Sequence, residues 1–260
     1  MIIKATNNIP NNLKYKYIIV DEYQDTSYIR YMFLKEIINK TGSKLVCVGD
    51  DYQSIYRFNG CDIDMFLNFK KYFGYTKVLK INNTYRNSQE LIDVAGSFIM
   101  KNKNQLYKKL KSNKHINKPI IICYYKNIYK LLDILVLKYK SVLILGRNNC
   151  DLMFDRNFVY KGCNIRCMTI HASKGLEDEC VILLNVVDDK LGMPCKIKDS
   201  EVLKYLYKNS SYYPYDEERR LFYVGLTRTK NEVYIMTRKN NESVFVKELK
   251  QHYFKYIRQI

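Results

Sequence analysis

The sequence predicts an α/β fold built around a parallel sheet. Short apolar runs at residues 17–20, 44–48 and 142–145 have the length and composition of buried strands. The segments between such runs, among them residues 28–40 and 217–226, are expected to be helical. Strands that alternate with helices are typical of parallel sheets. The 260 residues are enough for one or two domains with cores of their own.

Residues 1–80 are expected to form a first domain. The expected elements, in order, are a strand at 17–20, a helix at 28–40 capped by Ser27, a strand at 44–48, a helix at 63–72 and a strand at 77–81. Parallel sheets bind ligands beyond the carboxyl ends of their strands, and Asp21, Glu22 and Asp50 stand at two such ends. A ligand site is therefore expected there.

Residues 81–260 are expected to form a second domain, with the boundary between residues 76 and 82. The expected elements, in order, are a helix at 88–100 capped by Ser88, a strand at 120–124, a helix at 128–139, strands at 142–145 and 167–170, a loop with a helix at 171–177, a strand at 180–185, a helix at 217–226 and a strand at 233–237. Residues 101–118 hold seven lysines and no acid, which indicates either a solvated surface loop or a contact for DNA.

The charge balance is strongly basic. Lys and Arg number 44 against 26 Asp and Glu, which gives a net charge of +18. Such an excess suits a polyanionic partner, because each phosphate that is neutralised releases a condensed counterion. The alternative is that a chain rich in Lys, Asn and Ile reflects an AT-rich genome.

Other classes are excluded by composition. The eight cysteines are scattered, which indicates reduced thiols in an intracellular, cytoplasmic protein. Cys163 and Cys167 lack a second pair at zinc spacing, so no metal site is expected there. No apolar run approaches eighteen residues, so neither a membrane span nor a membrane partner is expected. Residues 1–12 do not have the composition of a secretory signal.

Two strings near the amino end carry chemistry. Asp21 and Glu22 lie in VDEYQDT, residues 20–26. A nucleotide triphosphatase uses such a pair, one carboxylate for Mg²⁺ and its neighbour for the attacking water, although a lone pair is usually a solvated strand end. The second string is VGDDYQSIYRF, residues 48–58. Its aromatic side chains would suit stacking on nucleic-acid bases, and the alternative is that they pack in the core.

Four further strings follow in the second domain. They are NTYR at 83–86, LGRN at 145–148, MTIHASKGLE at 168–177 and EERRLFYVGLTR at 217–228. Taken together and in order, the strings resemble motifs II to VI of superfamily 1 DNA helicases of the UvrD/Rep type, over residues 17–237. Within that family, residues 49–60 and the string MPCKIKD at 193–199 look most like the helicase IV branch.

The resemblance implies a fold and a set of catalytic residues. Residues 1–80 would be the remainder of a first RecA-like lobe and residues 81–260 a second RecA-like lobe of a P-loop NTPase helicase core. ATP and Mg²⁺ would be the cofactors, with ATP between the lobes. By the resemblance, Asp21 binds Mg²⁺, Glu22 activates water, Gln53 senses the γ-phosphate, Arg86 reaches the same phosphate and Arg228 is the arginine finger. Arg147 is expected to be structural or a backbone contact, and Arg219 and Arg220 are expected to pair with acids rather than to touch ATP.

The resemblance also implies binding residues. Tyr85 would stack on adenine, Glu177 would accept from the ribose hydroxyl, and Lys174 would support the site. Tyr56, Phe58 and His171 would contact single-stranded DNA. Thr84 and Asn87 depart from the Asn-Tyr-Arg-Ser pattern of most relatives, which puts the hydrogen bonds beside Tyr85 and Arg86 in doubt. Only 24 positions separate Arg147 from His171, so the accessory insertion of larger relatives is expected to be reduced or absent.

One family motif is missing from the sequence. The ten glycines include no Gly-x-x-x-x-Gly-Lys-[Ser/Thr] string, whose backbone amides and lysine hold the phosphates. The chain is therefore expected to be the carboxy-terminal part of an ATP-dependent 3′–5′ helicase or translocase that is inactive alone. Three explanations remain open, in decreasing order of preference. The chain is a portion of a longer protein, a separate chain supplies the phosphate loop, or the chain is a degenerate remnant. The rival class is a non-enzymatic DNA-binding or interaction module, against which the intact strings around Glu22 and Arg228 argue.

Overall fold

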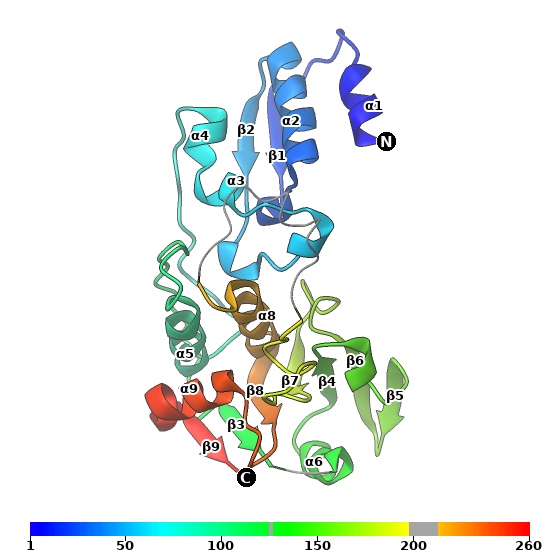
Figure 1. Ribbon diagram of the computed structural model, residues 1–260, viewed down its shortest axis with the longest axis vertical. Helices are drawn as coiled ribbons and strands as arrows, with labels where there is room; N and C mark the ends of the chain where they lie inside the picture. Colours follow the sequence, from blue (N-terminus) through cyan, green and yellow to red (C-terminus); the bar gives the residue numbers. More distant parts are fainter. Residues whose placement is uncertain (125–126, 198–212) are drawn as a thin grey trace. The chain divides into compact units, whose positions relative to one another are not determined.

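The computed structural model describes residues 1–124, 127–197 and 213–260 (Figure 1). They form two compact units. Residues 1–78 make unit 1, and the described residues from 79 onward make unit 2. Each unit contains parallel strands with helices, which confirms the α/β class predicted from the sequence.

Unit 1 is built around two parallel strands. Its elements are α1 (Ile2–Asn7), β1 (Tyr17–Val20), α2 (Tyr28–Thr41), β2 (Lys44–Cys47), α3 (Asp64–Leu67) and α4 (Phe69–Phe73). β1 and β2 pair in parallel with Val20 opposite Cys47, so both strands end at the same edge. Both strands were predicted. The single helix predicted at 63–72 is instead two short helices that meet at Asn68.

The turn after β1 is fixed by an aromatic cluster. Tyr23 is 1% exposed, and its ring centroid lies 5.4 Å from that of Phe69 and 6.3 Å from that of Phe73. Burial raises the pKa of the Tyr23 hydroxyl above its ordinary value. Ser27 precedes α2 in the extended conformation of a cap residue, but its side chain makes no capping hydrogen bond.

The prediction of a strand at residues 77–81 is wrong. These residues have no regular structure, and Val78, Leu79 and Ile81 are between 71% and 80% exposed. A strand needs a neighbour that accepts and donates its backbone hydrogen bonds, and no strand in the described ranges pairs with this segment. The apolar residues therefore form an extended connection.

Unit 2 contains a seven-stranded sheet with the order β5-β6-β4-β7-β8-β3-β9, parallel except for the β5–β6 pair (Figure 1). Its elements are α5 (Gln89–Ile99), β3 (Ile120–Cys123), α6 (Ile128–Leu135), β4 (Ser141–Gly146), β5 (Asn157–Tyr160), β6 (Cys163–Thr169), β7 (Asp178–Leu183), α8 (Asp216–Leu226), β8 (Thr229–Met236), α9 (Val244–Tyr253) and β9 (Ile257–Gln259). Ser88 caps α5, as predicted, by accepting from the Leu91 N–H at 3.4 Å.

Three parts of unit 2 differ from the sequence prediction. The helix predicted to residue 139 ends at Leu135, and Tyr139 instead donates from its hydroxyl to Glu232 at 2.6 Å. The short elements β5, α9 and β9, like α1 in unit 1, were not predicted. Residues 101–118 form a loop in which none of the seven lysines is buried.

The prediction of a helix at residues 171–177 is also wrong, because a helix would be too short to connect β6 to β7. β6 and β7 are both parallel to β4, so the eight residues between them must return from one edge of the sheet to the other. Thr169 is level with Gly146, whereas Cys180 is level with Val142. Eight helical residues would rise only about 12 Å, against about 3.3 Å per residue for extended chain. The segment is therefore a series of turns.

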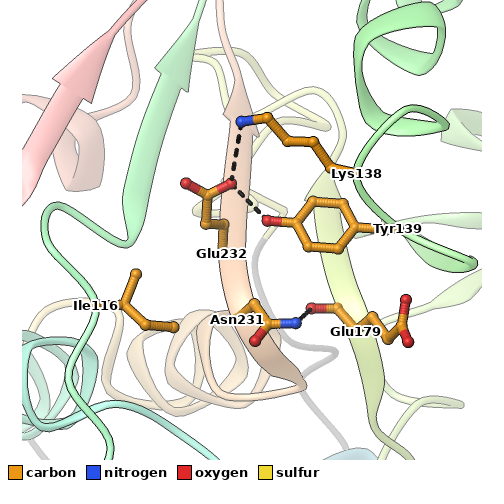
Figure 2. A pocket seen from close by; sticks show the side chains of 6 residues that line it. All are labelled: Ile116, Lys138, Tyr139, Glu179, Asn231 and Glu232. Atoms are coloured by element: carbon orange, nitrogen blue, oxygen red, sulfur yellow. Dashed lines mark hydrogen bonds and ion pairs between the residues drawn. The ribbon is translucent and has the colours of Figure 1, made fainter.

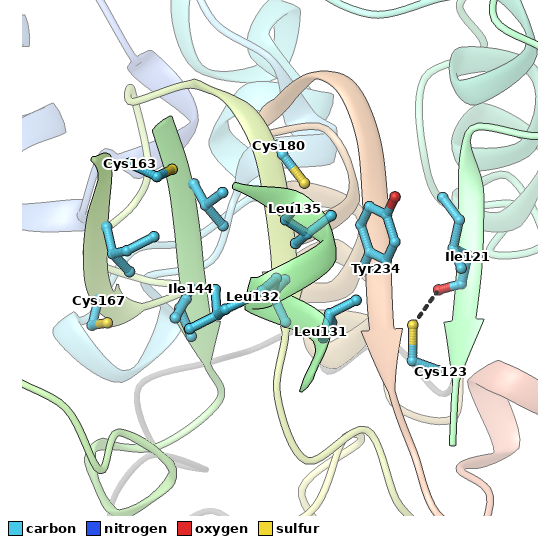
Figure 3. Packing of buried hydrophobic residues seen from close by; sticks show 13 residues of the cluster. Ile121, Cys123, Leu131, Leu132, Leu135, Ile144, Cys163, Cys167, Cys180 and Tyr234 are labelled. Carbon is cyan, nitrogen blue, oxygen red and sulfur yellow. Dashed lines mark hydrogen bonds between the residues drawn. The ribbon is translucent and has the colours of Figure 1, made fainter. Parts of the chain in front are cut away.

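One hydrophobic core cluster of unit 2 lies between α6 and one face of the sheet (Figure 3). Leu131, Leu132 and Leu135 of α6 are fully buried against apolar side chains of β3, β4, β6, β7 and β8. Four cysteines belong to this cluster, and burial raises the pKa of the Cys167 thiol to about 11. All eight cysteines are free thiols. In the part of the chain that the structure describes, no helix has both the length and the apolar character needed to cross a membrane.

Leu132→Ala tests this core. Leu132 is 0% exposed, so its truncation leaves a cavity and should lower the free energy of unfolding by about 2–5 kcal/mol. Leu137→Ala is the matched control, because Leu137 follows the same helix and is 86% exposed, and its effect should stay within about 0.5 kcal/mol. Urea denaturation followed by circular dichroism measures both. Equal effects of the two substitutions would contradict the packing described.

Candidate functional site

The carboxyl ends of β1 and β2 bring acidic residues together in unit 1. Asp21 and Glu22 follow β1 directly, and the N–H of Tyr23 donates to the Val48 carbonyl after β2 at 2.9 Å. Asp21 and Glu22 are both exposed, and Asp21 Oδ1 accepts from the Glu22 N–H at 2.8 Å. Glu22 has φ 50°, the left-handed conformation that is uncommon outside glycine and concentrates at functional sites.

Gln53 lies in the same part of unit 1. Its Nε2 donates to Asp50 Oδ2 at 2.8 Å, while Asp50 Oδ1 accepts from the Tyr52 N–H at 3.1 Å. Gln24, which sequence reasoning missed, is fully buried and hydrogen bonds both Glu22 and the Asp50 N–H. The structure thus brings Asp21, Glu22 and Gln53 into one neighbourhood.

Tyr56 and Phe58 form an aromatic pair, of which Phe58 is exposed. Their ring centroids are 6.0 Å apart in an edge-to-face arrangement with an interplanar angle of 70°. Phe58 is 54% exposed, so it is a surface residue and not part of a core. Tyr56 is half-buried, and burial, followed by the nearby charges of Asp25 and Glu22, raises the pKa of its hydroxyl.

In unit 2, three residues from distant parts of the sequence converge. Arg86 Nε donates to Glu177 Oε2 at 2.5 Å. Arg228 Nη1 donates at 3.3 Å to the carbonyl of Leu176, the residue before Glu177. Lys230, which sequence reasoning missed, lies 3.2 Å from Glu177 Oε1. The hydrogen bond from Arg86, followed by that from Lys230, lowers the pKa of Glu177.

Arg228 is buried in this arrangement. It is 1% exposed, and its Nε also donates to the Val224 carbonyl at 3.2 Å. Asn87 joins the same turn, since its Nδ2 donates to the carbonyls of Thr227 at 3.2 Å and Thr229 at 2.6 Å. Asn87, which departs from the family pattern, thus ties the segment that carries Arg86 to the turn that carries Arg228.

Tyr85 is an exposed residue that follows a main-chain segment paired with the loop at residues 101–118. Its side chain is 87% exposed. The main chain beside it is bonded to the loop, because the Thr84 N–H donates to the Lys111 carbonyl at 2.9 Å and the Lys111 N–H donates to the Asn82 carbonyl at 2.7 Å. From the sequence, this loop was expected to be a solvated surface loop or a contact for DNA, and nothing in the sequence indicates its pairing with Asn82 and Thr84.

His171 and Lys174 lie in the turns between β6 and β7, and both are half-buried. The turns are held by Ser173, whose hydroxyl donates to the Ile170 carbonyl at 2.7 Å. His171 follows the carboxyl end of β6, whereas Glu177 precedes the amino end of β7, at the opposite edge of the sheet. The height of the sheet therefore separates His171 from Glu177.

Arg147, Arg219 and Arg220 pair with acids, which was the expectation for Arg219 and Arg220. Arg147 makes a two-pronged contact with Glu218, with its shorter bond at 2.6 Å. Arg219 and Arg220 pair with Glu248 at 2.5 Å and Asp216 at 3.3 Å. These are buried or half-buried structural pairs.

A pocket of about 400 Å³ opens beside the amino ends of β7 and β8 (Figure 2). It is lined by Ile116, Lys138, Tyr139, Glu179, Asn231 and Glu232. Its polar groups bond one another, since Asn231 Nδ2 donates to the Glu179 carbonyl at 3.0 Å and Tyr139 donates to Glu232. None of the residues predicted to bind a ligand lines this pocket.

Glu177→Gln tests the cluster around Arg86 through pH. Because the folded-state pKa of Glu177 is lowered, its contribution to stability is present above the ordinary carboxyl pKa of about 4.3 and is lost as the pH falls through the lower folded value. The pair is about a third exposed, so we expect the substitution to cost less than about 1 kcal/mol at pH 7. The difference in urea midpoint should shrink from pH 7 to pH 3. A difference that stays constant would contradict this.

Comparison with known proteins identifies relatives. The model of the UvrD/REP helicase N-terminal domain matches residues 4–74, and that of the UvrD-like helicase C-terminal domain matches residues 152–240. DNA helicase IV of Escherichia coli (strain K12) is 33% identical over 247 residues, which cover 91% of this chain and 36% of that protein.

Two further relatives are shorter matches. ATP-dependent DNA helicase Rep of Buchnera aphidicola subsp. Baizongia pistaciae is 34% identical over 58% of this chain and 24% of its own length. ATP-dependent DNA helicase PcrA of Bacillus subtilis (strain 168) is 35% identical over 48% of this chain and 17% of its own length. The chain spans well under half the length of these relatives. It therefore combines segments of the UvrD/REP helicase N-terminal and C-terminal domains and is homologous to DNA helicase IV, Rep and PcrA.

Proposed function

We propose that the chain is the carboxy-terminal portion of an ATP-dependent DNA helicase that moves 3′ to 5′ on single-stranded DNA. The observation that carries this proposal is the convergence of Arg86, Glu177 and Arg228 in unit 2. They stand at positions 86, 177 and 228, so only the tertiary fold brings them together. The cluster offers a carboxylate that can accept from a ribose hydroxyl and guanidinium groups that can donate to phosphate oxygens.

The proposed roles follow from the chemistry of each side chain. Asp21 has an exposed carboxylate at a strand end, which fits Mg²⁺, a cation that prefers oxygen ligands. Bound Mg²⁺ would neutralise charge on the phosphates. Glu22 would orient the attacking water, and Gln53 would bond the γ-phosphate through its amide. Tyr85 offers an exposed ring for adenine, and Glu177 has a carboxylate for the ribose hydroxyl.

The arginines need different conditions to act. Arg86 is half-buried and can exchange Glu177 for a phosphate oxygen. Arg228 is buried with carbonyl acceptors, so it can serve as an arginine finger only if its guanidinium leaves at least one of them. Lys174 would support this site, while His171, on the turns after β6, would contact DNA with Tyr56 and Phe58.

A phosphate-binding loop must come from elsewhere. The sequence contains no Gly-x-x-x-x-Gly-Lys-[Ser/Thr] string, and the chain matches only 36% of DNA helicase IV. We propose that a longer polypeptide or a separate chain supplies this loop. The strings at residues 49–60 and 193–199 favour the helicase IV branch; residues 198 and 199 lie outside the described residues.

The isolated chain is expected to hydrolyse no ATP, even with single-stranded DNA present. The missing loop would provide most of the contacts to the triphosphate. Release of phosphate is the measurement, with Glu22→Gln as the control for contaminating enzymes. DNA-stimulated turnover that disappears in Glu22→Gln would overturn the prediction of inactivity.

The chain is expected to bind single-stranded DNA without sequence preference. The net charge of +18 predicts that affinity falls steeply as salt rises. Phe58→Ala should weaken binding by about 1–3 kcal/mol, because a stacked base is lost. Phe254→Ala is the matched control, since Phe254 is 66% exposed in unit 2 and has no proposed role. Fluorescence anisotropy with a labelled oligonucleotide measures both. Affinity that is independent of salt, or equal in the two variants, counts against the proposal.

A further inference from the structure

Gln24 is a buried polar side chain that the proposed ATPase roles leave unused. It is 0% exposed, and both ends of its amide are engaged. Its Nε2 donates to the Glu22 carboxylate, and its Oε1 accepts from the Asp50 N–H at 3.0 Å. The amide thus joins the turn after β1 to the turn after β2.

The Gln24 amide satisfies both partners at once, because it has a donor at one end and an acceptor at the other. The Glu22 carboxylate can only accept, and the Asp50 N–H can only donate. The orientation of the amide is therefore fixed by its partners, with nitrogen toward Glu22 and oxygen toward Asp50. A methionine fills similar space and offers neither bond.

The surroundings of Gln24 are built to admit it. A Cβ at Gly49 would meet Gln24 Oε1 and would lie 2.7 Å from the Phe66 ring, so only glycine leaves room for the amide. The Gln24 carbonyl accepts from the Ser54 hydroxyl at 3.2 Å, which ties it a second time to the segment after β2. A buried polar group held at both ends in this way has a defined position.

The connection continues from Asp50 to Gln53. The Asp50 side chain accepts from the Gln53 amide at 2.8 Å and from the Tyr52 N–H at 3.1 Å. Glu22, Gln24, Asp50 and Gln53 therefore form one continuous line of hydrogen bonds and covalent bonds. Glu22 and Gln53 stand at its two ends.

We propose that Gln24 is a positioning residue that couples the Glu22 carboxylate to the Gln53 amide. A change at Gln53, where the γ-phosphate would bind, is passed through Asp50 and Gln24 to the carboxylate that orients water. This inference rests on the proposed function, which assigns the attacking water to Glu22 and the γ-phosphate to Gln53. The coupling itself is a property of the chain without nucleotide or DNA.

A double-mutant cycle read by NMR tests the coupling on the full chain. The Gln53 side-chain amide is observed with ¹⁵N-glutamine labelling, and exchange of the Asp50 N–H with solvent is measured in parallel. Glu22→Ala should shift the Gln53 amide signal, whereas the same substitution made with Gln24→Met should leave that signal unmoved. Gln24→Met alone should also speed exchange of the Asp50 N–H about fivefold or more, because its acceptor is lost.

Gln89→Met is the matched control. Gln89 also bridges a carboxylate and an N–H, since it donates to Asp93 at 2.7 Å and accepts from the Ser112 N–H at 2.8 Å. It belongs to unit 2, so its loss should change neither signal in unit 1.

The outcomes are distinct. A Gln53 signal that ignores Glu22→Ala, or that responds equally with and without Gln24, overturns the coupling. Because Glu22 is exposed, Glu22→Ala remains informative even if Gln24→Met does not fold. The measurement uses no ATP, so failure of the coupling is separate from failure of the ATPase proposal, which phosphate release decides.

Discussion

The buried guanidinium of Arg228 donates to the carbonyl oxygens of Val224 and Leu176 at the amino edge of the unit 2 sheet. A permanently charged group is costly to bury unless its hydrogen bonds are satisfied. The last turn of α8 and the segment before β7 must therefore stay close together. Asn87 belongs to a third segment and donates to the carbonyls of Thr227 and Thr229 in the same turn. Its neighbour Arg86 is thereby placed where it can bond Glu177. The arrangement of Arg86, Glu177 and Arg228 depends on this one buried charge.

The two units place their candidate residues at different edges of their sheets. In unit 1, Asp21, Glu22 and Asp50 follow the carboxyl ends of parallel strands, the usual position for ligands in α/β proteins. In unit 2, Glu177 and Arg228 precede β7 and β8. The short return from β6 to β7 explains how one motif reaches both edges, since His171 begins the segment and Glu177 ends it. A single string of sequence thus carries residues that lie a sheet's height apart.

Ion pairs inside unit 2 determine where its charges lie. Several acids of unit 2, among them Glu218, Glu248 and Asp178, are held by arginines inside the fold. The lysines of the loop at 101–118 remain outside, where none is buried. The excess of positive charge is therefore on the surface, where it attracts a polyanion over a range set by salt.

The sequence by itself determined the α/β class, the strands at Tyr17–Val20 and Lys44–Cys47, most strands of unit 2, and the strings that hold the candidate residues. These features are local, because apolar runs and turn residues are read within a few positions. It could not exclude a strand at residues 77–81, since a strand exists only with a neighbour to bond. It also could not show that the helix ends before Tyr139, since Tyr139 bonds Glu232, which is far away in sequence. Nor could it reject a helix at 171–177, because the distance that this segment must cover is set by the height of the sheet. Only the tertiary structure revealed Gln24 as a partner of Glu22, Lys230 as a partner of Glu177, the bonds from Asn87 to the turn at Thr227 and Thr229, and the burial of Arg228. Hydrogen bonds between residues far apart in sequence exist only once packing has brought their atoms within about 3 Å of each other.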